Sequence, residues 1–128
     1  MITYSKLGRK GNLGNQLFQI ASTVGMAEKY GHDYFFSEWE YANFFKNDLP
    51  IFEMDDSFQV IKEKKIAYYE WDIGKQNYDL NGWLQSEKYF NEESIRKIFE
   101  WGSFSDQLLL NYNFIFTKKT ILVSIRRG

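Results

Sequence analysis

Two adjacent arginines at the end of the sequence have the chemistry to bind an anion. Arg126 and Arg127 follow an apolar run at residues 121–123 and precede Gly128. A short apolar run that ends in a charged turn is typical of a central parallel strand reaching the carboxyl edge of an open α/β sheet, where ligands bind. We therefore expect a strand from about residue 120 that presents arginine to a ligand. The alternative, two solvated residues at a strand end, is common for basic pairs.

A second group of candidate residues lies near the other end of the chain. Gly11 and Gly14 precede Asn15 and Gln16, at the point where a first strand gives way to a helix. Free N–H groups at such a helix start, with the helix dipole behind them, suit an anion or a sugar hydroxyl. The spacing fits neither the dinucleotide fingerprint nor a P-loop. Asn15 and Gln16 could equally cap the helix and hold its neighbouring loop.

Composition excludes several classes of function. The chain has 128 residues, a net charge of −1, no cysteine and a single histidine, His32. A histidine or thiolate metal site and a disulfide are therefore ruled out, and no basic excess favours nucleic acid. No apolar run approaches the roughly 18 residues of a membrane-spanning helix. These features leave the cellular location open, between the cytoplasm and the periphery of a membrane, and leave the oligomeric state open as well.

The order of predicted elements indicates a single α/β domain. A strand at residues 2–6, a helix at 14–30 and a strand at 33–37 form a βαβ unit, because apolar residues recur at helical spacing between them. Further short strands are expected at 58–61, 66–71 and 78–84, helices at 92–99 and 103–112, and a last strand from 120. The fold class that follows is a Rossmann-like, open, mainly parallel sheet.

Three segments, in order, resemble glycosyltransferase family 11, the α-1,2-fucosyltransferases. The first is residues 4–8 with 11–21, which include Gly-Asn-Leu-Gly-Asn-Gln-Leu-Phe-Gln-Ile-Ala. The second is Asn-Gly-Trp-Leu-Gln-Ser-Glu-Lys-Tyr-Phe at 81–90, and the third is Ser-Ile-Arg-Arg-Gly at 124–128, which is similar to the start of a His-x-Arg-Arg-x-Asp motif. Ser124 stands where many members have histidine, and the aspartate of the motif would be residue 129.

The resemblance implies a two-domain GT-B fold, of which residues 1–128 would be the N-terminal half, with the C-terminal nucleotide-binding domain absent. It implies an inverting, metal-independent enzyme without a cofactor, which transfers L-fucose from GDP-fucose to a galactose 2-hydroxyl of a glycan acceptor. The incomplete half would be inactive by itself. The other hypothesis is a non-catalytic domain with at most a glycan-binding or structural role.

Site residues follow from the matched segments. Arg126 is the expected catalytic residue, because a guanidinium can donate paired hydrogen bonds to the departing diphosphate. Arg127 is expected to assist in substrate binding or to be structural, since alternation along a strand turns neighbouring side chains to opposite sides. Gly14, Asn15 and Gln16 are expected to bind substrate at the interdomain cleft, and no residue is expected to bind a metal.

Overall fold

A four-stranded, fully parallel sheet forms the centre of the computed structural model, which describes residues 1–121 and 123. Its strands are β1 (Ile2–Thr3), β2 (Tyr34–Phe35), β3 (Phe58–Lys62) and β4 (Asn77–Asn81), in the spatial order β2-β1-β4-β3. The predicted open, parallel, Rossmann-like sheet is thereby confirmed. The first two strands are shorter than predicted, because each pairs over only two residues, Ile2 with Tyr34 and Thr3 with Phe35.

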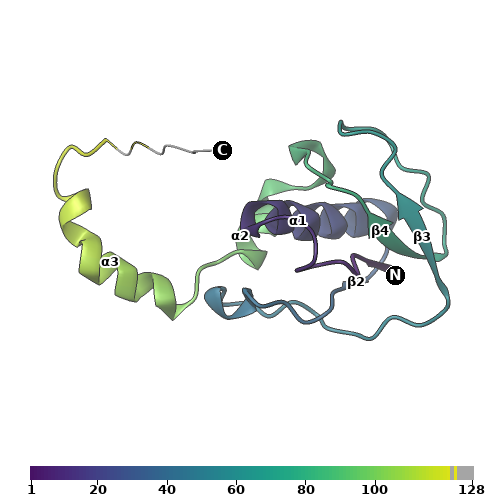
Figure 1. Cartoon of the computed structure of the whole chain (residues 1–128), viewed down its shortest axis with the longest axis horizontal. Helices are drawn as coiled ribbons and strands as arrows, with labels where there is room; N and C mark the ends of the chain where they lie inside the picture. The colour runs from purple at the N-terminus through teal and green to yellow at the C-terminus, as the bar shows by residue number, and fades with distance from the viewer. Residues whose placement is uncertain (122, 124–128) are drawn as a thin grey trace.

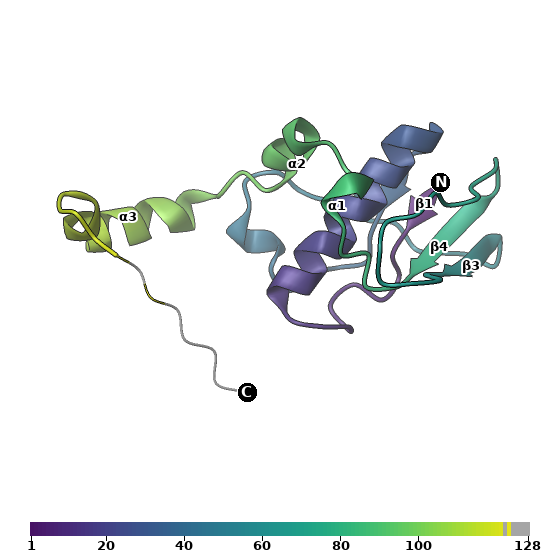
Figure 2. The ribbon, with the colours of Figure 1, turned by 90° about the horizontal axis from the view of Figure 1, so that it is seen from above.

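The long helix α1 (Leu13–Tyr30) packs along the sheet, as Figures 1 and 2 show. Its apolar stripe is fully buried at Ile20, Val24 and Ala27, which is why the predicted helix forms. The helix ends at Gly31, whose φ of 70° places it in the left-handed region. Glycine adopts this conformation without strain, so it terminates the helix where the sequence predicted.

One predicted strand, at residues 66–71, is absent from the structure, where this segment has no regular secondary structure. Its side chains pack on the last turn of α1 instead. Glu70 pairs with Lys29, and the Tyr30 hydroxyl donates a hydrogen bond to the carbonyl of Trp71 at 2.7 Å. Trp71 itself is buried. The aromatic residues of this segment, which indicated a strand, therefore pack against a helix instead.

The segment that follows β4, residues 82–90, packs directly against α1, and we call it the docking segment. Ser22 in the middle of α1 donates a hydrogen bond to the carbonyl of Leu84 at 2.7 Å. A Cβ atom added to Gly25 would lie 2.2 Å from the carbonyl oxygen of Tyr89. The helix can approach this backbone so closely only because residue 25 has no side chain.

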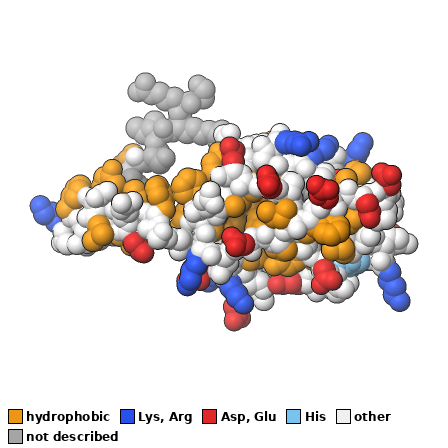
Figure 3. Space-filling view, turned by 90° about the horizontal axis from the view of Figure 1, so that it is seen from below, with side chains coloured by type: hydrophobic (Ala, Val, Ile, Leu, Met, Phe, Trp, Pro, Cys, Tyr) orange, Lys and Arg blue, Asp and Glu red, His pale blue; other side chains and the backbone are white. Residues whose placement is uncertain are grey.

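The remaining elements are helical, and the last of them, α3, extends away from the sheet (Figure 1). They are the 3₁₀ turns η1 (Ala42–Phe44) and η2 (Glu87–Tyr89) and the helices α2 (Glu92–Ile98) and α3 (Ser103–Phe116). Both α-helices were predicted, although α3 runs beyond residue 112. Hydrophobic side chains gather along α3, at the left of Figure 3, and Leu110 and Phe114 are among the exposed ones. None of the helices described is long and apolar enough to cross a membrane.

The predicted last strand lies mostly outside the described residues. Thr120, Ile121 and Val123 are described and are not in a strand. Arg126 and Arg127, with Ser124 and Gly128, lie outside the described part of the chain. The strand from residue 120 and the position of both arginines therefore stay predictions.

The close contact at Gly25 predicts a large effect of a single methyl group. Gly25→Ala should lower the free energy of unfolding by about 3 kcal/mol, because the new methyl overlaps the backbone of the docking segment. Gly14→Ala is the matched control in the same helix. No atom lies within 4 Å of its added Cβ, so it should raise stability by up to about 1 kcal/mol. Urea unfolding of both variants tests this, and equal stabilities would contradict it.

Candidate functional site at the carboxyl edge of the sheet

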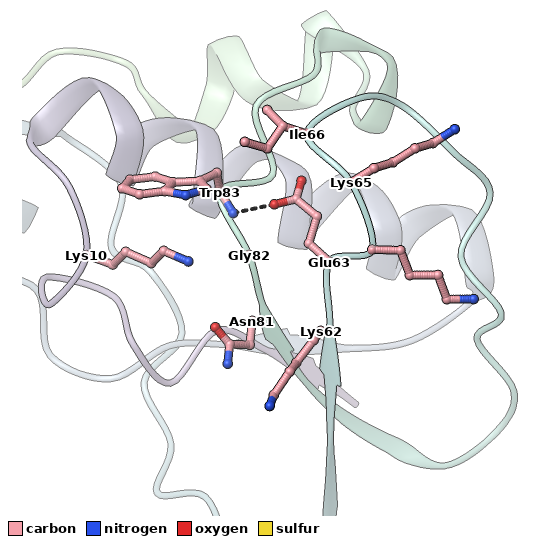
Figure 4. A pocket seen from close by; sticks show the side chains of 9 residues that line it. Lys10, Lys62, Glu63, Lys65, Ile66, Asn81, Gly82 and Trp83 are labelled. Carbon is pink, nitrogen blue, oxygen red and sulfur yellow. Dashed lines mark hydrogen bonds between the residues drawn. The ribbon is translucent and has the colours of Figure 1, made fainter.

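The carboxyl ends of the strands bring together residues from three separate parts of the chain. The turn at residues 7–12 follows β1, Glu63 follows β3, and Gly82 and Trp83 follow β4 (Figure 4). β1 lies inside the sheet, between β2 and β4. The chain continues from β1 to β2 on one side, and β4 pairs with β1 on the other side. Ligands of open α/β sheets bind outside the carboxyl ends of the strands. This edge is therefore the candidate site.

Two hydrogen-bonded contacts fix the end of β1 against β4. The buried carboxylate of Asp79 accepts hydrogen bonds from the Ser5 amide at 2.8 Å and from the Ser5 hydroxyl at 2.7 Å. The Tyr4 hydroxyl donates to the Gly82 carbonyl at 2.7 Å. Burial, together with the nearby Asp79 and Glu63 carboxylates, raises the pKa of Tyr4 to about 12. The phenol is therefore a stable donor at neutral pH.

Glu63 holds the turn after β4 in an uncommon backbone conformation. Its carboxylate accepts hydrogen bonds from the amides of Trp83 at 2.7 Å and Leu84 at 3.2 Å. Leu84 has a φ of 55°, in the left-handed region that a leucine rarely adopts. A Cβ atom on Gly82 would lie 2.5 Å from the Cβ of Glu63. Glycine at position 82 thus allows Glu63 to reach the two amides.

A pocket of about 310 Å³ opens beside this turn. Most of its lining residues are polar or charged, as Figure 4 shows: Lys10, Lys62, Glu63, Lys64, Lys65, Ile66, Asn81, Gly82 and Trp83. The ammonium group of Lys10 lies 4.7 Å from the centre of the Trp83 ring, within the range of a cation–π contact. The glycine-bearing turn and the Gly82–Trp83 segment, distant in sequence, therefore share one pocket.

A larger pocket, of about 600 Å³, lies at the ends of β1 and β2. Apolar residues including Phe35 and Phe52 line part of it, and its polar side chains are Thr3, Ser5, Arg9, Ser37, Glu38 and Glu53. Hydroxyl, carboxylate and guanidinium groups beside an aromatic wall suit the hydroxyls and the faces of a sugar. Sequence reasoning did not single out these residues, because only the parallel pairing of β1 with β2 brings them together.

The residues predicted to bind substrate near the start of α1 lie at this edge. They differ in their exposure and in the hydrogen bonds that they already make. Gly14 is exposed. The side-chain oxygen of Asn15 accepts a hydrogen bond from the Asn12 amide at 3.1 Å. Gln16 is buried, donates to the Gly11 carbonyl at 2.9 Å and accepts from the Trp39 indole at 2.6 Å. These contacts favour the alternative in which Asn15 and Gln16 cap the helix and support the neighbouring loop.

Sequence reasoning missed Asp79 and Glu63, although a signal existed for one of them. Asp79 is an acidic residue between Tyr78 and Leu80 in a buried strand, and such a residue requires a specific partner. Glu63 gives no such signal, because its role depends on the backbone of the turn after β4. Within residues 1–121 and 123, no group of three or more potential metal ligands occurs.

Comparisons with known proteins do not place this chain in a family: no family model, no curated protein and no solved structure matches it.

The Tyr4 contact predicts a specific dependence of stability on pH. A raised pKa in the folded state means that stability is retained below pH 10 and is lost as the pH rises from about 10 to 12. Tyr4→Phe should cost about 1 to 2 kcal/mol at pH 7, since the Gly82 carbonyl loses its partner, and should flatten part of this alkaline loss. Burial also raises the pKa of Tyr30, Tyr34 and Tyr69, so some slope remains.

Unfolding curves at pH 7, 10 and 11.5 measure both effects. Tyr112→Phe is the control, because Tyr112 is half-exposed on α3 and should change neither quantity. An unchanged alkaline slope in Tyr4→Phe would contradict the assignment.

Proposed function

We propose that this chain is the N-terminal, Rossmann-like half of an α-1,2-fucosyltransferase that transfers L-fucose from GDP-fucose to a galactose 2-hydroxyl. One observation carries the proposal: the first two segments that resemble the family contact each other. The Tyr4 hydroxyl donates a hydrogen bond to the Gly82 carbonyl at 2.7 Å, and the Phe18 ring packs edge-on against the Phe90 ring, with the ring centroids 6.0 Å apart. Chance similarity in two short segments gives no reason for them to adjoin at the ligand-binding edge of a parallel sheet.

In the proposed reaction, the acceptor oxygen attacks C1 of fucose from the side opposite the diphosphate. The C1–O bond to the β-phosphate breaks, GDP departs with the electron pair, and the acceptor hydroxyl loses its proton to a base that the described residues do not identify. The proposed role of Arg126 is to donate to the β-phosphate oxygens as their charge increases. Such a contact favours the transition state over the ground state and therefore accelerates transfer.

The described residues would contribute the acceptor side of the cleft. The pocket of Ser5, Arg9, Ser37 and Glu38 offers hydrogen-bond donors and acceptors to sugar hydroxyls. The exposed Gly14 would leave the first amides of α1 accessible. Asn15 and Gln16 would act by holding the loop in place, and Arg127 would assist Arg126 or support the strand.

A non-catalytic glycan-binding domain is the second candidate. The two pockets at the carboxyl edge favour it, because they are formed by described residues alone. The nucleotide sequence beyond codon 128 separates the candidates. An in-frame aspartate followed by a further α/β pattern supports the transferase, whereas a stop codon supports the binding domain.

The 128-residue polypeptide should bind GDP-fucose weakly or not at all and should transfer no fucose. Half of a cleft cannot bury a nucleotide, and a hydrated arginine is screened from phosphate. Calorimetric titration with GDP-fucose and an assay with lactose as acceptor measure both properties. Micromolar affinity with turnover would show that the polypeptide is sufficient, contrary to the proposal.

In a protein that includes the nucleotide-binding domain, Arg126→Lys should lower kcat about 10²- to 10³-fold. The formal charge is kept, but an ammonium cannot reproduce the paired geometry of a guanidinium. Arg127→Lys is the matched control and should have a smaller effect. Measurement of kcat and KM with GDP-fucose and a galactoside, alongside a melting curve, decides the matter. Normal turnover by a folded Arg126→Lys enzyme would remove Arg126 from the mechanism.

A further inference from the structure

The pocket at the ends of β3 and β4 has a charge that a neutral acceptor sugar would not require. Resting on the proposed function, we propose that this pocket binds an anionic substituent, a sulfate, phosphate or carboxylate, carried by the acceptor glycan. The acceptor would thus be an acidic galactoside rather than a neutral one. The residues that would make the contact are Lys10, Lys62 and Asn81, with Trp83 as a wall (Figure 4).

The local charge is opposite to that of the whole chain. Four lysines and a single carboxylate line the pocket, whereas the chain has a net charge of −1. The ion pairs found among the described residues involve Lys29, Lys46 and Arg96, and none of them involves a lysine of this pocket. Its ammonium groups therefore form no ion pair with a carboxylate among the described residues and can bind an external anion.

The carboxylate in the pocket does not neutralise these lysines directly. Glu63 is occupied by the amides of Trp83 and Leu84, at 2.7 Å and 3.2 Å. Its position is fixed further by contact with Gly82. Hydrogen bonds to two backbone donors disperse the negative charge of a carboxylate. Glu63 thus shapes the wall of the pocket while the cationic side remains open.

Three polar side chains line that open side. Lys62 and Asn81 are paired in the β3–β4 register, so their side chains leave the same face of the sheet. Lys10 approaches from the turn after β1, with its ammonium beside Trp83. Its backbone is anchored by Gln19, whose amide donates to the Lys10 carbonyl at 3.1 Å. In contrast, Lys65 points away from Trp83 in Figure 4 and contributes only at longer range.

This arrangement fits an anion on a sugar better than a free anion. Two ammonium groups and an amide donor provide charge and hydrogen bonds for its oxygens. The neighbouring pocket of Ser5 and Ser37 offers groups for the hydroxyls of the same molecule. A ligand that uses both pockets gains from each contact, whereas an inorganic ion uses only the lysines.

The test compares four probes by ¹⁵N NMR titration of the chain: galactose, galactose 6-sulfate, glucose 6-sulfate and inorganic sulfate. Galactose 6-sulfate should bind about tenfold more tightly than galactose at low salt, and the difference should shrink at 0.5 M salt. Lys10→Ala combined with Lys62→Ala should abolish the difference. Lys75→Ala combined with Lys97→Ala, in a loop and on α2 away from the pocket, is the charge-matched control and should retain it.

Equal affinity for galactose and galactose 6-sulfate would overturn the inference, as would full retention of the difference by a folded Lys10, Lys62 double variant. Inorganic sulfate binding as tightly as galactose 6-sulfate would also overturn it, because the site would then be one for a free ion. Tight binding of glucose 6-sulfate equal to that of galactose 6-sulfate would support the anionic site and contradict the galactose acceptor of the proposed function. The two proposals can therefore fail separately.

Discussion

The close contact between α1 and the docking segment determines how the candidate site is built. Gly25 leaves no space for even a methyl group between the helix and the backbone of Tyr89, and Ser22 bonds to the carbonyl of Leu84. Because the two backbones pack so closely, α1 holds the turn that follows β4 in place. It fixes the path of residues 82–90 and, with it, the wall of the candidate site.

The strained turn after β4 is maintained from three directions. Tyr4 holds the Gly82 carbonyl from β1, Glu63 holds the amides of Trp83 and Leu84 from the end of β3, and Ser22 holds the Leu84 carbonyl from α1. Leu84 is buried and has a positive φ. A leucine keeps such a backbone conformation only where the surrounding contacts hold it there. Such sites often have a function, and here the turn places Trp83 at the edge where ligands of parallel sheets bind.

Sequence periodicity was sufficient for the fold but only partly for the site. The apolar spacing and Gly31 predict α1 within one residue, and the βαβ order predicts the parallel sheet. The segment at 66–71 was wrongly predicted as a strand, because aromatic residues that pack on a helix have the same composition as a strand. Gly14, Asn15 and Gln16 lie at the start of α1, and their role in binding substrate stays a prediction. The contact of Gln16 with Trp39 depends on tertiary structure. For the same reason, nothing local to Glu63 could predict its part in the site, and Arg126 and Arg127 stay predictions outside the described residues.

We propose that the turn after β1 and the turn after β4 form one sugar-binding edge. The most direct measurement is a map of backbone amide shifts in the ¹⁵N NMR spectrum on addition of methyl β-galactoside, with methyl β-glucoside as the reference. If the two turns bind galactose together, galactoside-specific changes should fall on residues 5–16, 37–38 and 81–84. Changes confined to α2 and α3, or identical changes with both sugars, would contradict it.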